Sequence, residues 1–370
     1  MTTQTVQFMQ RAIELAEKGL GRTSPNPPVG AVVVHGGNIV GEGFHPEAGK
    51  PHAEVFALQA AGDSVRGGDL YVTLEPCSHQ GRTGPCADAL IAAGIARVFV
   101  GTQDPNPQVA GRGLKRLREA GIDVHCGVLE EECRRLIAPF SKYVSYGLPY
   151  VVYKSAMTLD GQTATAAGDS KWISCSASRE LVHQLRNHVD GIVVGAGTVK
   201  VDNPQLTTRL VDGGRDPARV VFDGRLETSP GSTVYTQLSE AATILVTSED
   251  FTEETLHPYL AEGTEIIQVP CNVDGLDLRA ALVALGKRGL HSLLLEGGGT
   301  LGGAMLRAGL VDRMMVFVAP KLLGGIGRSL FAGKGVASIS EAFHLTDMRT
   351  SHVDTDILIE GEVQHVHRTD

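Results

Sequence analysis

The sequence has few of the features that mark secreted or membrane proteins. No apolar stretch approaches the ~20 residues that a membrane-spanning helix needs, so no membrane span is predicted. The first twenty residues carry Glu14 and Glu17 within an amphipathic helical pattern, which is not that of a signal or transit peptide. Only six cysteines are scattered over 370 residues. We therefore expect reduced thiols and a cytoplasmic location.

Positive charge is also in short supply. Lysine and arginine together number 33, against 42 aspartates and glutamates, which gives a formal net charge of −9. Such a chain repels polyanions overall. It also lacks a stripe of basic residues interleaved with aromatic ones. These two absences argue against a nucleic-acid partner.

What is present is the composition of a globular protein. Hydrophobic residues make up 42% and charged residues 20%, so each half of the chain can bury a core. A chain of 370 residues predicts two domains, since one domain usually takes about 100–200 residues. The break at Gly147 to Pro149 places the boundary near residue 147. We predict domains 1–146 and 147–370, with no internal repeat or low-complexity linker.

Both predicted domains have an α/β pattern. In the first, strands and helices alternate, which predicts repeated β-α units on a mostly parallel sheet. Its expected strands are 29–34, 69–77, 96–105 and 122–129, and its expected helices are an opening helix in the first twenty residues, 52–62, 86–94, 113–121 and 130–147. The second domain has short β-branched strands at 150–161, 190–198, 218–224, 242–248, 264–270, 291–299 and 312–320, with helical segments that include 178–189 and 278–289.

A candidate metal site lies in the first domain. His52 opens one predicted helix, while Cys77 follows a strand and Cys86 begins another helix. One imidazole and two thiolates suffice for a catalytic zinc site, because such a site keeps its fourth position open. Glu54 follows His52 by two residues and is the candidate proton carrier. The alternatives are a closed structural zinc site or cysteines that only pack. We expect the other four cysteines to be small buried hydrophobes: Cys126, Cys133, Cys175 and Cys271.

The order of these residues is that of the zinc nucleobase deaminases, whose signature is His-x-Glu followed by Pro-Cys-x-x-Cys. Here residues 78–85 separate the two cysteines, which is a longer interval. The longer stretch from Pro76 to Cys86 resembles the deaminases of riboflavin biosynthesis. Within this resemblance, loops around residues 24–30, 104–107 and 111–113 face the substrate, and the implied substrate-binding residues are Asn26, His79, Asp104 and Asn106.

A glycine-rich turn marks the second domain. The apolar segment ending at Glu296 is followed by a G-x-G-x-x-G pattern, formed by the glycines at 297, 299 and 302, and then by a helix. Bare amides in such a turn can bind a dinucleotide phosphate. The pattern comes late in its domain and lacks the acidic ribose ligand expected about twenty residues further on. A tight turn that only needs small residues for packing remains the alternative.

Further segments of the second domain, among them 154–161, 170–174, 195–199, 202–209 and 319–321, resemble the reductases of riboflavin biosynthesis. The whole chain is thus similar to the bifunctional riboflavin-biosynthesis deaminase–reductase family. The resemblance implies a cytidine-deaminase-like three-layer domain followed by a dihydrofolate-reductase-like domain, with one zinc ion and NADPH as cofactors. The implied cofactor-binding residues are Ala156, Trp172, Thr198, Asp202, Gly297, Gly298, Gly299, Thr300, Leu301, Gly302 and Gly303, and the implied substrate-binding residues are Lys154, Ser170, Arg186, Leu206, Arg209 and Glu296.

The family resemblance predicts a reaction sequence. The substrate would be 2,5-diamino-6-ribosylamino-4(3H)-pyrimidinone 5′-phosphate, which is deaminated and then reduced from ribosyl to ribityl, with hydride reaching C1′. Two arginines suit its phosphate, because a guanidinium offers a planar fork to phosphate oxygens. The resemblance also implies a homo-oligomer, either dimer or tetramer. Two alternatives stay open here: an enzyme with one active domain and one scaffold domain, and a nucleic-acid editing protein that acts on a flipped base.

Overall fold

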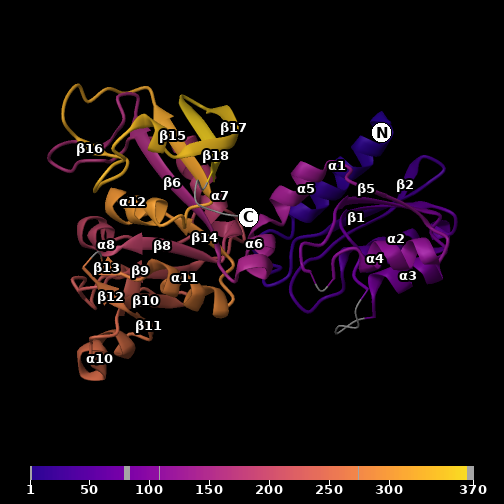
Figure 1. Cartoon of the computed structure of the whole chain (residues 1–370), viewed down its shortest axis with the longest axis horizontal. Helices are drawn as coiled ribbons and strands as arrows, with labels where there is room; N and C mark the ends of the chain where they lie inside the picture. Colours follow the sequence, from indigo (N-terminus) through magenta and orange to yellow (C-terminus); the bar gives the residue numbers. More distant parts are fainter. Residues whose placement is uncertain (1, 79–83, 108, 274, 365–370) are drawn as a thin grey trace. The chain divides into compact units, whose positions relative to one another are not determined.

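The computed structural model describes residues 2–78, 84–107, 109–273 and 275–364, so His79 lies outside the described residues. The chain divides into two compact units, Met1–Leu148 and Pro149–Asp370 (Figure 1). The boundary predicted between residues 146 and 147 lies two residues before this division. None of the described helices combines the length and the apolar character needed to cross a bilayer.

The first unit is built on a five-stranded sheet of order β2-β1-β3-β4-β5. Its strands are β1 (Gly30–His35), β2 (Asn38–Phe44), β3 (Asp69–Leu74), β4 (Arg97–Thr102) and β5 (Asp123–Cys126). Strands β3, β4 and β5 are parallel, but β1 runs antiparallel to both β2 and β3. Four of the five strands therefore run in one direction, as the prediction of a mostly parallel sheet requires, and β1 is the exception.

A tight hairpin explains this exception. Gly36 and Gly37, between β1 and β2, have φ values of 56° and 80°, which is the left-handed backbone of a two-residue hairpin turn. Such a turn returns the chain alongside β1 and adds the strand β2, which the sequence pattern did not reveal. The glycines are needed because other residues rarely adopt this conformation.

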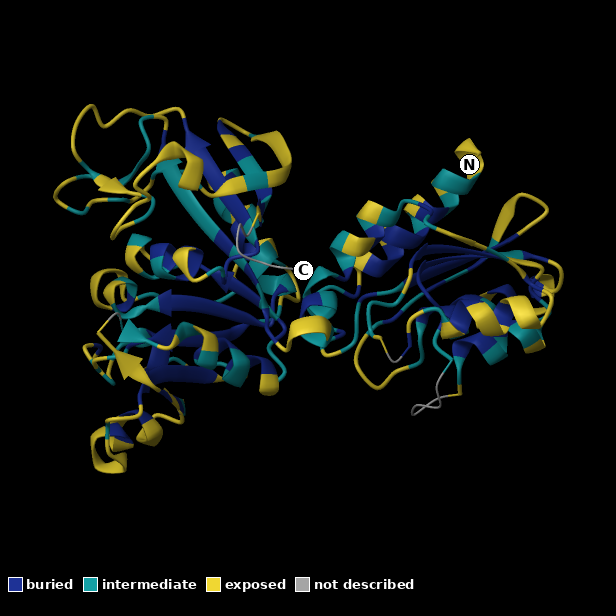
Figure 2. Cartoon of the chain, viewed as in Figure 1, coloured by how far each residue is buried: buried dark blue, intermediate teal, exposed yellow. Residues whose placement is uncertain are grey.

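Helices cover both faces of this sheet, giving three layers (Figure 2). On one face, α1 (Thr3–Glu17) and α5 (Glu130–Leu136) pack on side chains such as Val32 and Phe99. On the other, α2 (Ala53–Ala61), α3 (Cys86–Ala93) and α4 (Arg112–Glu119) pack on the alternate residues of the same strands. A short 3₁₀ helix, Gly62–Val65, follows α2.

The closing helix predicted over 130–147 is two helices in the structure. Helix α5 ends at Leu136, and α6 spans Ala138–Tyr146. Pro139 lies in the first turn of α6, where its missing N–H costs nothing. A proline inside one continuous helix would lose a hydrogen bond to the preceding turn, so the chain restarts the helix at this point.

The second unit has a nine-stranded sheet of order β11-β10-β9-β8-β14-β6-β15-β18-β17. In this order, the seven strands from β11 to β15 are parallel to one another. Strand β18 is antiparallel to both of its neighbours, β15 and β17. The strands are β6 (Tyr150–Thr158), β8 (Gly191–Gly195), β9 (Ala218–Phe222), β10 (Thr243–Ser248), β11 (Glu265–Val269), β14 (Ser292–Leu295), β15 (Arg313–Ala319), β17 (His344–Val353) and β18 (Asp356–Gln364). Two small pairs, β7 (Gln162–Ala164) with β16 (Arg328–Ser329) and β12 (Cys271–Asn272) with β13 (Gly275–Leu276), lie outside this sheet.

The helices of this unit are α7 (Ser176–His188), α8 (Ala196–Asp202), α9 (Thr233–Thr236), α10 (Glu253–Ala261), α11 (Leu278–Lys287) and α12 (Gly299–Arg307), with a 3₁₀ turn at Ile339–Glu341. Helix α7 packs on β6, β15 and β18. Helices α8 to α10 contribute to a core with β8, β9 and β10. The first turns of α8 and α12 follow β8 and β14, which are adjacent parallel strands, so both lie at the same edge of the sheet.

The terminal hairpin of β17 and β18 was not predicted. Strand β17 is almost wholly exposed, so its residues show no alternation of apolar and polar side chains (Figure 2). It is held by backbone pairing with β18, in a register that only the folded sheet reveals.

The cysteines outside the candidate zinc site correct another prediction. Only Cys133 is a buried hydrophobe; Cys126 and Cys271 are exposed, and Cys175 is half-buried at the start of α7. Cys126 ends β5, the edge strand of its sheet, and Cys271 belongs to a two-residue strand of a two-stranded sheet, so each lies at the margin of its sheet. All six cysteines are free thiols.

Candidate functional site: a metal centre and a charged cluster

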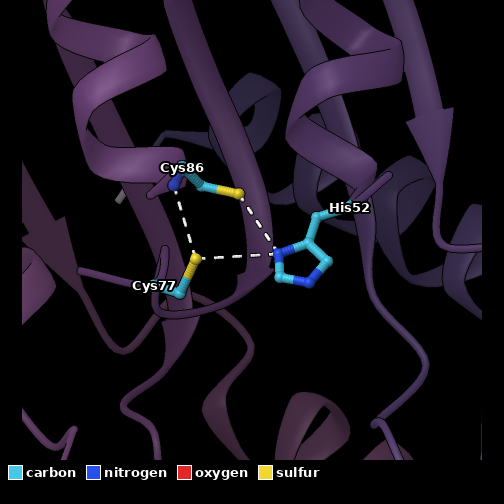
Figure 3. A group of neighbouring side chains, drawn as sticks. All are labelled: His52, Cys77 and Cys86. Carbon is cyan, nitrogen blue, oxygen red and sulfur yellow. Dashed lines mark hydrogen bonds between the residues drawn. The ribbon is translucent and has the colours of Figure 1, made fainter. Parts of the chain in front are cut away.

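Three loops of the first unit bring the predicted zinc ligands together. His52 directly precedes α2, Cys77 follows β3, and Cys86 is the first residue of α3. His52 Nδ1 lies 3.3 Å from Cys86 Sγ and 3.7 Å from Cys77 Sγ (Figure 3). The three ligand atoms all lie within 4.8 Å of one another.

These separations fit a zinc ion. Ligand atoms in a tetrahedral site with bonds of about 2.0–2.3 Å are separated by about 3.3–3.8 Å. Figure 3 also shows the second ring nitrogen of His52 turned away from the sulfurs, so Nδ1 is the atom offered to the metal.

The local backbone favours an anionic sulfur. The backbone N–H of Cys86 donates to Cys77 Sγ at 3.3 Å, and the N–H of Ala87 donates to the carbonyl oxygen of Cys77. Both donors belong to the N-terminus of α3, whose dipole favours negative charge. Hydrogen bonding from the Cys86 side chain, with smaller contributions from His52 and from the Cys86 backbone N–H, lowers the pKa of the Cys77 thiol to about 4. Zinc requires such a thiolate as its ligand.

Glu54 lies beside these ligands without being one of the three. It is in the first turn of α2 and only 3% exposed. Burial raises the pKa of its carboxyl group, while the neighbouring His52 opposes this effect. Its electrostatic neighbours include both cysteines of the site. A buried carboxyl with a raised pKa is suited to take up and release a proton at neutral pH.

The structure adds a residue that the sequence pattern missed, the buried His45. Its Nδ1 faces the carbonyl oxygen of Pro51 at 3.0 Å, and its Nε2 lies 3.1 Å from Asn26 Nδ2. Because the carbonyl can only accept, Nδ1 carries the proton and Nε2 accepts from the Asn26 amide. The ring also packs edge-on against His52, with centroids 5.5 Å apart. His45 thus orients Asn26, a predicted substrate residue, beside the metal centre; no spacing rule in the sequence points to it.

The other predicted substrate residues of this unit, Asp104 and Asn106, lie in the loop after β4. Since β3 and β4 are adjacent and parallel, this loop leaves the same sheet edge as the one that carries Cys77. The backbone N–H of Asn106 donates to Asp104 Oδ1 at 2.8 Å. Both side chains are half-buried.

The second unit places three charged residues together. Arg186 on α7 makes two parallel hydrogen bonds to Glu296, of 2.8 and 2.9 Å, and a third to the carbonyl oxygen of Thr207. Lys154 on β6 lies with its ammonium 5.6 Å from the centre of the Phe317 ring. Burial lowers the pKa of Lys154, and Glu296 opposes this shift. Although burial disfavours a charged Glu296, the Arg186 guanidinium holds its pKa below the ordinary value.

The remaining predicted substrate residues differ in how they can act. The side chain of Leu206 is 4% exposed and packs in the core with β8 and β9, so only its backbone is left for a ligand. The exposed Arg209 is anchored by its backbone N–H, which donates to His183 Nδ1 at 3.1 Å. Among the described residues, the hydrogen bonds and ion pairs do not link Ser170, Trp172 or Asp202 to the Arg186–Glu296 pair.

The glycines of the glycine-rich turn differ in role: some are required for packing, and one is a candidate for phosphate binding. A Cβ atom on Gly302 would lie 2.7 Å from the Tyr153 ring, and one on Gly303 would lie 2.6 Å from the carbonyl oxygen of Ala332. Packing therefore requires these glycines. Gly298 differs, because the nearest atom to its Cβ position is Thr198 Oγ1, at 3.9 Å. The position of Gly298 before the first turn of α12 leaves the backbone N–H groups of that turn as candidate donors to a phosphate. Ala156 lies on β6 with a half-buried side chain.

Comparisons with known proteins cover both units. Residues 2–102 match the family described as the cytidine and deoxycytidylate deaminase zinc-binding region, and residues 149–359 match the RibD C-terminal domain. The riboflavin biosynthesis protein RibD of Escherichia coli (strain K12) is 42% identical over 364 residues, which covers 95% of this chain and 97% of the relative.

Solved structures agree with these matches. Acinetobacter baumannii RibD, form 1, is 37% identical with a TM-score of 0.85, and the match covers 98% of this chain and 99% of that chain. A diaminohydroxyphosphoribosylaminopyrimidine deaminase/5-amino-6-(5-phosphoribosylamino)uracil reductase from Thermotoga maritima is 41% identical with a TM-score of 0.84 and the same coverage. The predicted fold class, a deaminase-like domain followed by a reductase-like domain, is thereby confirmed.

Proposed function

Because the chain belongs to the RibD family of bifunctional riboflavin-biosynthesis enzymes, we propose that it acts on both family substrates in succession. The first unit deaminates 2,5-diamino-6-ribosylamino-4(3H)-pyrimidinone 5′-phosphate. The second reduces the ribosyl group of the product to ribityl, giving 5-amino-6-ribitylamino-uracil 5′-phosphate. The observation that carries the first step is the convergence of His52, Cys77 and Cys86 beside the buried Glu54.

In the deaminase step, His52 Nδ1 and the two cysteine sulfurs would hold zinc. Bound zinc makes a water molecule acidic enough to ionise near neutral pH. Glu54 takes the proton of the attacking water and returns it to the departing ammonia. Asn26, oriented by His45, together with Asp104 and Asn106, would bind the pyrimidine in place. His79, outside the described residues, is part of the same proposal.

In the reductase step, NADPH supplies the hydride that reduces C1′. The N-terminus of α12 at Gly298, next to Thr198, would receive a phosphate of the cofactor. Lys154, Arg186 and Glu296 form a cluster of charged side chains that would contact the substrate. The guanidinium of Arg186 is already bound to Glu296 and to Thr207, so we assign the sugar phosphate to Arg209. The preference for NADPH over NADH and the homo-oligomeric state rest on the family resemblance.

An assay of both steps in one reaction tests the proposal. Zinc-loaded protein is given the diamino substrate with NADPH, and ammonia and NADPH absorbance are followed together. We expect ammonia release first and NADPH oxidation only after it. NADPH consumption without ammonia would contradict the assigned order, and ammonia without any later NADPH consumption would contradict the reductase activity of the second unit.

A pair of glycine variants separates packing from cofactor binding. Gly302→Ala is expected to destabilise the second unit by about 1–3 kcal/mol, because its methyl group meets the Tyr153 ring. Gly298→Ser keeps a favourable residue at the start of α12, so its stability should be unchanged. Its side chain lies near Thr198, and the KM for NADPH should rise by about tenfold. Thermal unfolding and steady-state kinetics measure the two effects; an unchanged KM in Gly298→Ser would place the cofactor elsewhere.

A further inference from the structure

Glu75 lies between the loop that carries Cys77, after β3, and the loop that carries Asp104 and Asn106, after β4. It follows β3 directly and precedes the ligand Cys77 by two residues. Its backbone N–H donates to the carbonyl oxygen of Thr102, at the end of β4. Glu75 is buried, with only 4% of its surface exposed. Burial of a carboxylate is costly unless hydrogen bonds replace its water.

Four backbone amides supply those hydrogen bonds. Oε1 accepts from the N–H groups of Gly113 and Leu114, at 2.9 and 3.3 Å. Oε2 accepts from those of Asp104 and Gly111, at 3.2 and 2.9 Å. The carboxylate thus binds both ends of the segment 104–114.

One end of this segment is the N-terminus of α4. The residue before the helix, Gly111, has no side chain to satisfy the first N–H groups. Glu75 takes that role from another strand, and its negative charge suits the positive end of the helix. Gly113 permits the approach, since a Cβ there would lie 2.0 Å from the carbonyl oxygen of Pro76.

The other end carries the predicted substrate residues. The N–H of Asp104 is bound by Glu75, and Asp104 Oδ1 in turn accepts the N–H of Asn106. Movement of the Glu75 carboxylate would therefore shift both residues relative to the metal centre. The position of Cys77 depends less on the Glu75 carboxylate, because the backbone N–H groups of Cys86 and Ala87 already bind Cys77.

We propose that Glu75 is a positioning residue of the deaminase: by holding both ends of residues 104–114, it sets Asp104 and Asn106 in register with the metal centre and thereby governs substrate binding. The inference rests on the proposed function, since it needs deamination as its readout. Glu75 acts on substrate only through the loop.

The test is Glu75→Gln in the full-length, zinc-loaded protein. Glutamine keeps the shape but replaces one accepting oxygen by an amide nitrogen, so two of the four N–H groups lose their partner. We expect the KM for the diamino substrate to rise about tenfold, with kcat changed by less than about threefold. Zinc content and reductase activity should be unchanged. Hydrogen–deuterium exchange of the amides of 111–114 should be faster, which a role in metal binding alone would not cause.

Glu42→Gln is the matched control. It also removes a carboxylate that accepts two hydrogen bonds, here from Arg11, but on β2. Its deaminase KM should equal that of the wild type. Should Glu75→Gln fail to fold, Glu75→Asp is the variant to measure, because it retains the charge on a side chain too short to keep all four hydrogen bonds. Its deaminase KM should rise above that of the wild type with zinc content unchanged, and a wild-type KM would overturn the positioning role.

Three results separate the possibilities. A wild-type KM in Glu75→Gln overturns the positioning role, even if amide exchange is faster. Loss of zinc and of kcat at unchanged KM also overturns it, because Glu75 would then support the metal ligands. If the wild-type protein itself releases no ammonia, the proposed function fails, and with it this role.

Discussion

Replacing Glu54 by glutamine is expected to lower the kcat of deamination by about 10²–10⁴-fold, the range that a well-placed proton carrier contributes. Glutamine has nearly the shape of glutamate, so the buried site around it should remain closed. It cannot take a proton from water and return it to ammonia. The three zinc ligands are separate side chains, and the metal should stay bound.

Three measurements test this variant: the rate of ammonia release, the zinc content by elemental analysis, and the reductase rate on substrate that is already deaminated. We expect one zinc per chain and an unchanged reductase rate, since the second unit is a separate compact body. Glu47→Gln is the control, because Glu47 is an exposed glutamate of the same unit. Normal deamination by zinc-loaded Glu54→Gln would refute the proton-carrier role.

Removing a metal ligand is expected to have the second large effect, on zinc affinity and on deamination. Cys77→Ser is expected to lower zinc affinity by more than about a hundredfold, since even groups that only orient a ligand contribute 10–100-fold. The serine hydroxyl does not form the anion that the Cys77 sulfur forms here, where hydrogen bonding lowers its pKa to about 4. Deamination should be lost with the metal.

This variant is measured by zinc content after dialysis and by ammonia release with and without added zinc. Cys126→Ser serves as the control, because Cys126 is an exposed thiol of the same unit. It should keep both zinc and activity. A Cys77→Ser protein that holds one zinc per chain and deaminates at the normal rate would show that the metal centre is assigned to the wrong residues. Retention of reductase activity excludes global unfolding as the cause.

The candidate zinc ligands were accessible from the sequence because each is tied to a local signal. His52 and Cys86 stand at helix starts and Cys77 at a strand end, and the loops after strands and before helices converge at one sheet edge. His45 and Glu75 carry no such signal. Their partners are Asn26 and the backbone of 104–114, which come close only when distant segments fold together.

Within the glycine-rich turn, too, the sequence identified the residues but not the role of each. The sequence pattern could not separate phosphate binding from packing, because glycine serves both. The structure separates the two roles through the atoms that an added Cβ would meet. At Gly302 it would meet the Tyr153 ring, whereas at Gly298 the nearest atom is the more distant Thr198 Oγ1. Similarly, Leu206 belongs to a segment that resembles the reductases, yet its side chain is part of the core.

Strand and helix periodicity, the order of metal-binding residues and the family motifs were enough to determine two α/β domains and a deaminase–reductase pair. These features depend on near neighbours in the chain, whose spacing can be read directly. Only the tertiary structure decided the antiparallel pairing of β2, the terminal hairpin of β17 and β18, and the contacts of Glu75. The reason is physical: backbone amides and carbonyls are the same at every residue, so the sequence does not record which of them a distant strand or carboxylate will bind.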